Sequence, residues 1–149
     1  MDNENIISIK NEYILKCSDL YIKVFNAEPW NDKWTLGTAH KRLNDIYISP
    51  NFEGVLCVEY GKVIGAIFGN YEQYYDGVHY NLREMFVSNE FQRKGIGSKL
   101  LKELEKRLRR LGVITIILLT SKENKTSTFY LKNDFSEWDS MAIMGKDLL

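Results

Sequence analysis

The chain has 149 residues, a length that suits one ordinary domain with a full hydrophobic core, so we expect a single domain over residues 1–149. It carries 20 basic and 20 acidic side chains, and 44% of its residues are hydrophobic. Because the charges balance, the protein as a whole has no field that would attract nucleic acid or an anionic membrane, and we expect neither as a partner.

The cysteines and the apolar segments favour a soluble, cytoplasmic protein. Cys17 and Cys57 are isolated within apolar stretches, which is typical of buried, reduced thiols in a cytosolic protein. The N-terminal residues are acidic and polar, unlike a signal peptide. The longest apolar run, Val113 to Leu119, has seven residues and is too short to span a membrane. Without a CxxC motif, and with only His40 and His79, the sequence predicts no metal site.

The first half of the chain predicts a strand, two helices and a β-hairpin, in that order. Apolar residues at helical spacing, ended by proline, indicate the helices, and Thr35 is suited to cap the second one. A Tyr-Gly-Lys turn at residues 60–62 between two apolar runs indicates the hairpin. The predicted elements are the strand Ile6 to Lys10, the helices Asn11 to Phe25 and Thr35 to Ile48, and the hairpin strands Val55 to Glu59 and Val63 to Phe68.

The second half predicts an aromatic loop at residues 70–80, then a strand-helix-strand crossover, and finally a short helix and a last strand. Such a crossover joins parallel strands whereas the hairpin is antiparallel, so the sheet must be mixed. The apolar run Val113 to Leu119 suits a strand buried on both faces. The predicted elements are the strand Leu82 to Val87, the helix Gly95 to Leu111, which Gly112 ends, the strand Val113 to Leu119, the helix Lys125 to Lys132 and the strand Met141 to Met144.

The stretch FQRKGIGSKLL, residues 91–101, places two glycines at the start of a basic helix. The first turn of a helix has unpaired N–H groups and the positive end of the helix dipole, so it binds phosphate when side chains stay clear, as Gly95 and Gly97 allow. Residues 92–112 hold eight basic and two acidic side chains, a local charge of +6. That charge alone favours a solvated helix face, but after the glycine pair it also fits a ligand with several phosphates or a nucleic-acid surface. Leu100 stands where a Rossmann fingerprint needs its third glycine, and the chain has no P-loop motif.

Residues Gln92 to Gly97 match the Q/RxxGxG/A signature, and through them the chain resembles the GNAT superfamily of N-acetyltransferases, which binds acetyl-coenzyme A (acetyl-CoA). The resemblance covers nearly the whole chain. EYGKVIGAIFGN is similar to the second and third strands of the family, EMFVSNEFQRKGIGSKLL to the fourth strand and the pyrophosphate helix, TSTFYLKNDF to a later helix with its tyrosine, and MAIMGKDLL to the closing strand.

The resemblance implies a mixed α/β, α+β-like fold in three layers. A mostly antiparallel central sheet with splayed fourth and fifth strands would carry helices on both faces. It also implies an acetyl-CoA-dependent N-acetyltransferase, an acyltransferase that moves the acetyl group to a primary amine by direct attack in a ternary complex.

The resemblance further implies where acetyl-CoA binds. The main chain of Met85, Phe86 and Val87 would pair with the pantetheine arm, and an N–H near Phe86 or Val87 would polarise the thioester carbonyl. Tyr130 matches the frequent general acid of the family, which protonates the leaving thiolate, and a phenol with a reference pKa of about 10 suits that role. The segment that would cradle the pyrophosphate comprises Gln92, Arg93, Lys94, Gly95, Ile96, Gly97 and Ser98.

Two positions depart from the family pattern. An asparagine commonly lies seven residues before the tyrosine, where this chain has Glu123 followed by Asn124. Asn124 would therefore contact the coenzyme or simply cap the helix. Asp134 replaces the usual glycine before phenylalanine, and we expect it to adopt the left-handed turn at modest cost.

Glu84 is the first choice for the general base, because it lies on the strand that would meet the thioester. The alternative is a structural carboxylate paired with Arg83, Arg93 or a lysine. His79 and Asp76 are weaker candidates for the base, since a loop histidine beside a tyrosine is more often a surface or packing residue.

The resemblance implies that two loops form the acceptor pocket, and both mix aromatic side chains with carboxylates. That mixture suits a small cationic amine of the aminoglycoside or polyamine type, through cation–π attraction and charge pairing. A peptide or protein amine, or a non-catalytic acyl-CoA-binding module, is the alternative, and the tryptophans could instead form a packed rim or a homodimer contact. The residues are Glu28, Trp30, Asp32 and Trp34 in the first loop and Tyr71, Glu72, Tyr74, Tyr75, Asp76 and His79 in the second.

Overall fold

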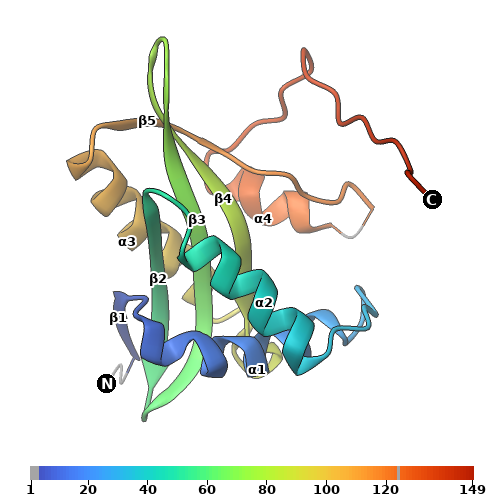
Figure 1. Cartoon of the computed structure of the whole chain (residues 1–149). Helices are drawn as coiled ribbons and strands as arrows, with labels where there is room; N and C mark the ends of the chain where they lie inside the picture. The colour runs from blue at the N-terminus through green and yellow to red at the C-terminus, as the bar shows by residue number, and fades with distance from the viewer. Residues whose placement is uncertain (1–3, 124) are drawn as a thin grey trace. The chain divides into compact units, whose positions relative to one another are not determined.

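The structure is a computed structural model that describes residues 4–123 and 125–149 (Figure 1). The chain divides into two compact units, Met1–Leu119 and Thr120–Leu149, each of which is treated by itself below. Among the helices in the described ranges, none combines the length and the apolarity that crossing a membrane requires.

The first unit is built on a five-stranded sheet in the order β1-β2-β3-β4-β5. The strands pair antiparallel from β1 to β4, and only β4 and β5 run parallel. The sheet is therefore mixed and mostly antiparallel, as the sequence predicted. The strands are β1 (Glu4–Ser8), β2 (Phe52–Glu59), β3 (Lys62–Tyr74), β4 (Gly77–Val87) and β5 (Val113–Ile117).

Helices cover both faces of the sheet, which gives three layers (Figure 1). On one face lie α1 (Ile14–Phe25), preceded by the 3₁₀ turn η1 (Asn11–Tyr13), and α2 (Leu36–Tyr47). On the other lies α3 (Ile96–Arg110), preceded by the 3₁₀ turn η2 (Asn89–Phe91). Thr35 caps α2 in a reciprocal capping box with Thr38, so the predicted cap is confirmed.

Buried side chains fill both layers. On the α1 and α2 side, Cys17 and Leu43 join a cluster with Phe68 and Phe86 of the sheet. On the α3 side, a side chain at Gly65 would come within 3.0 Å of Leu100, so glycine lets α3 pack closely on β3. The core therefore fixes both helix layers directly against the central strands.

The predicted aromatic loop at residues 70–80 is wrong, because β3 and β4 continue through it as a hairpin. The ladder extends to the pair Tyr74 and Gly77, which leaves Tyr75 and Asp76 as the turn. Gly77 has a φ of 145°, a conformation open to glycine. Tyrosines pack well on a pleated surface, and this favours strand over loop where the sequence showed mainly polar and turn-forming neighbours.

The last two predicted strands also need correction. β5 ends at Ile117, and its Ile114 side chain is 58% exposed, so the run is not buried on both faces. β5 forms the outer edge of the described sheet, with β4 as its only neighbour there. In the second unit, α4 (Thr126–Lys132) confirms the predicted helix, whereas residues 141–144 form no strand and Met141 and Ile143 are exposed. An isolated four-residue strand without a paired neighbour is not stable, which accounts for the difference.

Candidate active site

A bulge separates the two halves of β4. Phe68 of β3 pairs with Glu84, whereas the next residue, Gly69, pairs with Leu82, so Arg83 is the extra residue. A bulge bends its strand and increases its twist. The pairing with β5 covers only residues 78–81 of β4. Beyond the bulge, the described β5 no longer accompanies β4, and the two strands splay as the resemblance implied.

Met85, Phe86 and Val87 lie on this departing half of β4. Each pairs with β3 on one edge, and in the described chain no strand pairs with them on the other edge, where the Gln92 side chain reaches the Val87 carbonyl. The Phe86 ring is buried among aromatic side chains, so it does not reach that edge. An extended ligand arm could add to this edge as an additional strand does.

The segment after β4 ends in the left-handed conformation at Gly95, whose φ is 81°. Gly95 is the N-cap of α3, and no side chain caps the helix there. The first-turn N–H groups of α3 are thus not occupied by a capping side chain, which is the arrangement that binds phosphate. A residue with a Cβ would be strained at this φ, so the conformation explains the first glycine of the pair.

The side chains of this segment have separate roles. Gln92 donates to the Val87 carbonyl over 3.1 Å and to Asn89 Oδ1 over 2.8 Å, so it ties the segment to the end of β4. Ile96 is buried in the core, and Lys94 lies 5.3 Å from the centre of the Phe91 ring. The exposed residues of the predicted pyrophosphate segment are Gln92, Arg93, Lys94 and Gly95, and the partly exposed ones are Gly97 and Ser98.

Glu84 lies on the sheet face that α1 and α2 cover, and it is held there by two donors. The Tyr21 hydroxyl donates to Glu84 Oε2 over 2.7 Å, and Arg42 Nε donates to the same oxygen over 2.9 Å. The predicted structural partners, Arg83, Arg93 or a lysine, are wrong, because Glu84 points toward the helix layer. Within the described ranges Oε1 accepts no hydrogen bond, so one carboxylate oxygen is fixed and the other is open.

Burial, followed by the neighbouring Glu84 charge, raises the pKa of Tyr21 far above its ordinary value. Tyr21 therefore keeps its proton throughout the neutral range and remains a donor. Tyr21 lies within the helix predicted over Asn11 to Phe25, but nothing in the sequence indicated its partner. Arg42 carried no signal that set it apart from other basic residues on predicted helices.

Aromatic rings surround Glu84 and its two donors, Tyr21 and Arg42, which together we call the Glu84 clamp. The Tyr21 ring lies 4.9 Å from Trp34 and 5.3 Å from Phe86, centre to centre, and Trp30 lies 5.6 Å from Phe25. Asn26 makes two 2.9 Å hydrogen bonds to the Trp34 main chain, one to its carbonyl and one from its N–H. The structure thus brings the two predicted tryptophans to the aromatic cluster beside Glu84. Glu28 and Asp32 are exposed near them in sequence, and Asp32 accepts from Trp34 Nε1 over 3.1 Å.

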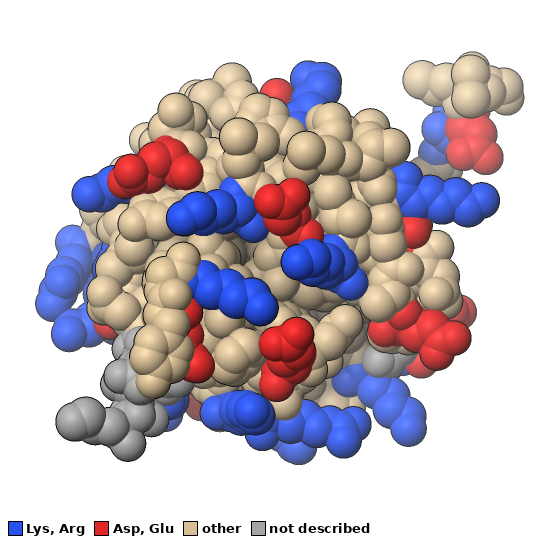
Figure 2. All heavy atoms as spheres, turned by 90° about the horizontal axis from the view of Figure 1, so that it is seen from below, with Lys and Arg blue, Asp and Glu red and all other residues tan. Residues whose placement is uncertain are grey.

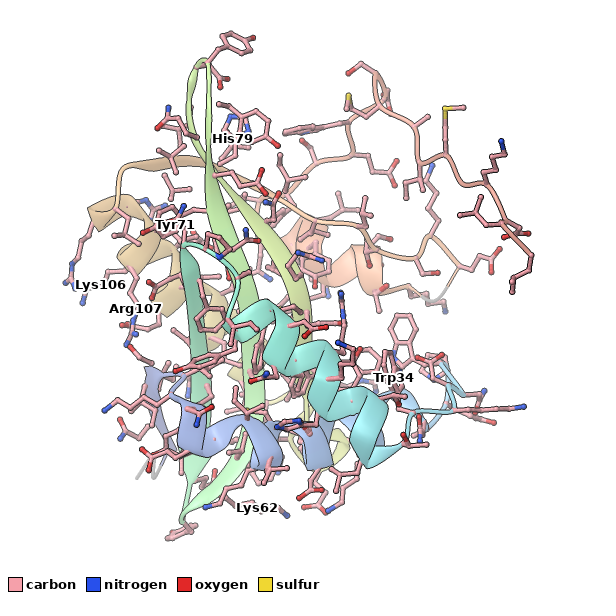
Figure 3. All side chains as sticks on the ribbon, viewed as in Figure 1. Trp34, Lys62, Tyr71, His79, Lys106 and Arg107 are labelled. Atoms are coloured by element: carbon pink, nitrogen blue, oxygen red, sulfur yellow. The ribbon has the colours of Figure 1, made fainter. Side chains whose placement is uncertain are left out.

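The other predicted acceptor residues form a second group at the tip of the β3–β4 hairpin. The Tyr74 and His79 rings stack with centres 4.2 Å apart, and His79 Nε2 lies 3.0 Å from Asp76 Oδ1. Tyr75 is fully exposed in the turn. Figure 3 shows His79 well up the hairpin and Trp34 beside the N-terminal end of α2. The predicted acceptor residues therefore fall into two separate groups.

The basic surface of α3 is partly neutralised by its own acids. Arg107 pairs with Glu103 over 3.1 Å, and Arg109 pairs with Glu105 over 3.4 Å. Arg107 also donates to Ser8 of β1. A nucleic-acid surface needs an uncompensated basic stripe, so these pairs weaken that alternative.

A groove of about 400 Å³ lies beside α1, the β2–β3 turn and the start of η2. Its charged residues include Lys16, Lys23, Lys62 and Glu90, and Lys62 Nζ is 3.8 Å from Glu90 Oε2. Figure 2 shows basic and acidic side chains interspersed over the face seen from below. The groove contains none of the predicted site residues, and its mixed charges favour no single ligand.

In the second unit, Tyr130 lies on α4 between two phenylalanine rings. Its ring centre is 5.2 Å from that of Phe129 and 5.4 Å from that of Phe135, and its carbonyl accepts from the Phe135 N–H over 3.0 Å. Asp134 has a φ of 69°, which confirms the predicted left-handed turn. The predicted contact or cap at Asn124 lies outside the described residues. Within the described ranges, no group of three or more His, Cys, Asp or Glu side chains is placed to hold a metal ion.

Comparison with known proteins identifies the family. A profile of the acetyltransferase (GNAT) domain matches residues 50–137, from β2 into the segment after α4. The chain therefore belongs to the GNAT acetyltransferase family, whose members use acetyl-CoA, and it is an acyltransferase.

Individual relatives agree with this assignment. Acetyltransferase SG1711 of Sodalis glossinidius is 29% identical over 122 residues, which is 81% of this chain and 79% of the relative. The crystal structure of a possible acetyltransferase from Clostridium difficile 630 has a TM-score of 0.82 at 15% identity, with 99% of both chains covered. The aminoglycoside N-acetyltransferase AAC(6')-Iy in complex with CoA has a TM-score of 0.74 at 15% identity, with 98% of this chain and 95% of that chain covered. At these identities the structural matches speak for the fold.

Proposed function

We propose that this protein transfers the acetyl group of acetyl-CoA to a primary amine of a small cationic acceptor, by direct attack in a ternary complex. The observation that carries the proposal is the clamped carboxylate of Glu84. Tyr21 and Arg42 fix its Oε2, Oε1 is open, and the carboxylate stands on the strand that separates from β5. A base in this place can accept a proton from an amine that approaches the open edge of β4.

The residues beside the open edge fit acetyl-CoA. The uncapped first turn of α3 after Gly95 suits the pyrophosphate, and the main chain of residues 85–87 suits the pantetheine arm. When bound, acetyl-CoA supplies an activated acetyl group as a thioester. An N–H near Phe86 or Val87 would donate to the thioester oxygen and stabilise the negative charge that develops there.

The proton transfers then have named residues. The acceptor nitrogen forms a bond to the carbonyl carbon, and Glu84 takes a proton from that nitrogen, directly or through a water molecule. The carbon–sulfur bond breaks, and Tyr130 gives its proton to the leaving sulfur. The products are the acetylated amine and coenzyme A, so no further reactant is needed.

The surroundings of Glu84 support a cationic acceptor. Trp30 and Trp34 belong to the same segment as Glu28 and Asp32, and Asp32 accepts from Trp34; aromatic rings and carboxylates both attract a protonated amine. The fold is shared with an aminoglycoside N-acetyltransferase, which is consistent with an acceptor of this type. The proposed acceptor is therefore an aminoglycoside or a polyamine.

A thiol-release assay with acetyl-CoA tests the function. The purified protein is offered polyamines, aminoglycosides, amino acids and peptides in parallel, and free coenzyme A is followed over time. We expect release with cationic small molecules above the level without acceptor. Calorimetry with acetyl-CoA accompanies the assay, and no binding at millimolar ligand would sink the proposal. Release with peptides alone would move the acceptor to the peptide class.

A further inference from the structure

Four polar residues form a patch on the hairpin, beyond the Glu84 clamp. In the β3–β4 ladder, Asn70 pairs with Asn81 and Glu72 pairs with His79. Asn81 Nδ2 donates to Glu72 Oε1 over 2.9 Å, which links the two pairs. We call these residues, Asn70, Glu72, Asn81 and His79, the hairpin patch.

The bulge at Arg83 places the hairpin patch on the same sheet face as Glu84. Side chains two residues apart on a strand share a face, so the β3 partners at positions 68, 70 and 72 point to one side. Their partners on β4 are residues 84, 81 and 79. Without the extra residue, positions 79 and 81 would lie on the opposite face from Glu84. The bulge thus creates one continuous polar stripe.

Two atoms of the patch are buried without a hydrogen-bond partner in the described chain: Asn70 Oδ1 and His79 Nδ1. Asn70 as a whole is only 8% exposed, and the His79 side chain is 12% exposed. Leaving a buried polar atom unpaired is costly, so each of them calls for a partner. Both lie on the face that also presents the open oxygen of Glu84.

The free atoms accept hydrogen bonds. Asp76 is an acceptor when ionised, so His79 donates to it through Nε2 and, in the neutral ring, keeps a lone pair on Nδ1. Asn70 offers a carbonyl oxygen, and the carboxylate of Glu72 adds negative charge. The patch is therefore complementary to a group with several N–H donors and a positive charge, such as a protonated amine.

The spacing to Glu84 sets the length of such a ligand. Along β3, the partners of the patch lie two and four residues from the partner of Glu84. At about 3.4 Å per residue, this places the two pairs roughly 7 and 14 Å from the Glu84 pair. A single short amine therefore cannot contact Glu84 and the whole hairpin patch at the same time.

We propose that the hairpin patch binds a second protonated amine of the acceptor while its reacting amine faces Glu84. The preferred acceptor is then an extended molecule with amino groups separated by about the distance from Glu84 to the patch. This inference rests on the proposed function. It predicts the length of the acceptor molecule, which the Glu84 clamp alone does not determine.

Calorimetry with two amines tests this inference. Spermidine spans the stripe, whereas 1,3-diaminopropane is too short, and each is titrated into the protein with and without coenzyme A. We expect spermidine to bind at least about tenfold more tightly than the shorter diamine, a difference equivalent to about 1.4 kcal/mol. Equal affinities, or no spermidine binding, would overturn the inference.

Variants locate the binding. Glu72→Gln removes a charge from an exposed side chain, and Asn70→Leu removes the buried acceptor at similar size. Both variants should weaken the binding of spermidine about fivefold to tenfold and leave the affinity for 1,3-diaminopropane unchanged. Glu105→Gln, on the helix that covers the opposite face, is the matched control and should change the affinity for neither amine. An unaltered spermidine affinity in Glu72→Gln contradicts the inference even if Asn70→Leu does not fold. If these binding effects appear but no amine triggers coenzyme A release, the patch stands and the proposed function fails.

Discussion

Tyr21 and Glu84 lie 63 positions apart in the chain and are joined by a 2.7 Å hydrogen bond from the Tyr21 hydroxyl to Glu84 Oε2. The bond ties α1 to the half of β4 that leaves β5. Arg42 of α2 donates to the same oxygen, so both helices of one layer orient a single carboxylate. A carboxylate fixed at one oxygen presents the other in a defined direction, which is what a general base requires.

Glu84→Gln should lower kcat by about 10²–10⁴, because the amide cannot accept the acceptor's proton. The affinity for acetyl-CoA should remain within about twofold, since the coenzyme contacts proposed here use main chain near residues 85–87 and the start of α3. Stopped-time thiol release and calorimetry measure the two quantities. Glu105→Gln again serves as control. A Glu84→Gln enzyme with full activity would show that the carboxylate is only structural.

Tyr21→Phe removes one of the two donors to Glu84 and should lower both stability and turnover. Losing a hydrogen bond to a charged group costs about 1.5–3 kcal/mol, so denaturant unfolding should report a loss of that order. We expect kcat to fall by about tenfold, less than in Glu84→Gln, because Arg42 still holds the carboxylate.

A double-mutant cycle separates positioning from general damage. If Tyr21 acts through Glu84, adding Tyr21→Phe to Glu84→Gln should leave kcat nearly unchanged. If the reductions in kcat of the two single variants instead multiply in the double variant, Tyr21 affects turnover by another route, such as the packing of its ring against Trp34 and Phe86.

Gly95→Ala should weaken acetyl-CoA binding, because it forces a side chain into a φ of 81° at the start of α3. The left-handed conformation costs a non-glycine residue about 1–2 kcal/mol, and relief of that strain would move the first-turn N–H groups. Gly112→Ala is a matched control, since Gly112 has a φ of 79° and open space around it but lies at the other end of the helix. Both variants should lose similar stability, and only Gly95→Ala should lose coenzyme affinity. Equal affinities in calorimetry would contradict the phosphate role of the turn.

Local signals made individual caps and turns predictable. The Thr35 cap and the left-handed turn at Asp134 each depend on a few neighbouring residues, and both are found as predicted, whereas the left-handed φ of Gly95 was not predicted. The crossover from β4 through α3 to β5 follows from the order of apolar segments, and its parallel pairing is also confirmed.

The surroundings of Glu84 and the course of the hairpin depended on distant relationships that no local pattern records. Glu84 meets partners 42 and 63 positions away, so its clamp appears only when α1 and α2 pack on the sheet. The bulge at Arg83 reverses which residues of β4 share a face with Glu84, and the sequence carries no turn-former there to announce it. The sequence also predicted a loop where the hairpin extends through residues 70–80. Pairing between the two strands, rather than local composition, makes these residues form strands.

Stability should fall as the pH rises from 9 toward 12. Burial raises the pKa of the Cys17 thiol from 9.0 to about 12, so in this range the unfolded chain releases a proton that the folded chain keeps. Since the unfolded state then binds fewer protons, the free energy of unfolding decreases with pH, by at most about 1.4 kcal/mol per unit for one group. Tyr21, whose pKa is also raised by burial, adds to the decrease above its ordinary value of 10.0.

Denaturant titrations at pH 8, 9 and 10 measure this slope. Cys17→Ala should flatten it between pH 8 and 9, where tyrosines in the unfolded chain have barely begun to ionise. Val24→Ala truncates a buried residue on the same helix, so it should lower stability without altering the slope. If the two variants keep the same slope as the unaltered protein, the thiol does not contribute to it.

Tyr130→Phe should retain acetyl-CoA affinity and lose turnover, because the ring is kept and only the proton donor is removed. General acid catalysis contributes typically 10²–10⁴-fold, so we expect kcat to fall by about 10² or more. Phe129 and Phe135 flank the Tyr130 ring and pack against carbon atoms in either case, which should keep α4 folded. Circular dichroism and calorimetry with acetyl-CoA establish that fold and binding survive. Tyr60→Phe, which removes a hydroxyl from the exposed β2–β3 turn, is the control and should leave kcat unchanged. A Tyr130→Phe protein with unchanged turnover would require another group to protonate the thiolate, whereas a protein in which neither form turns over any amine would favour a module that only binds acyl-CoA.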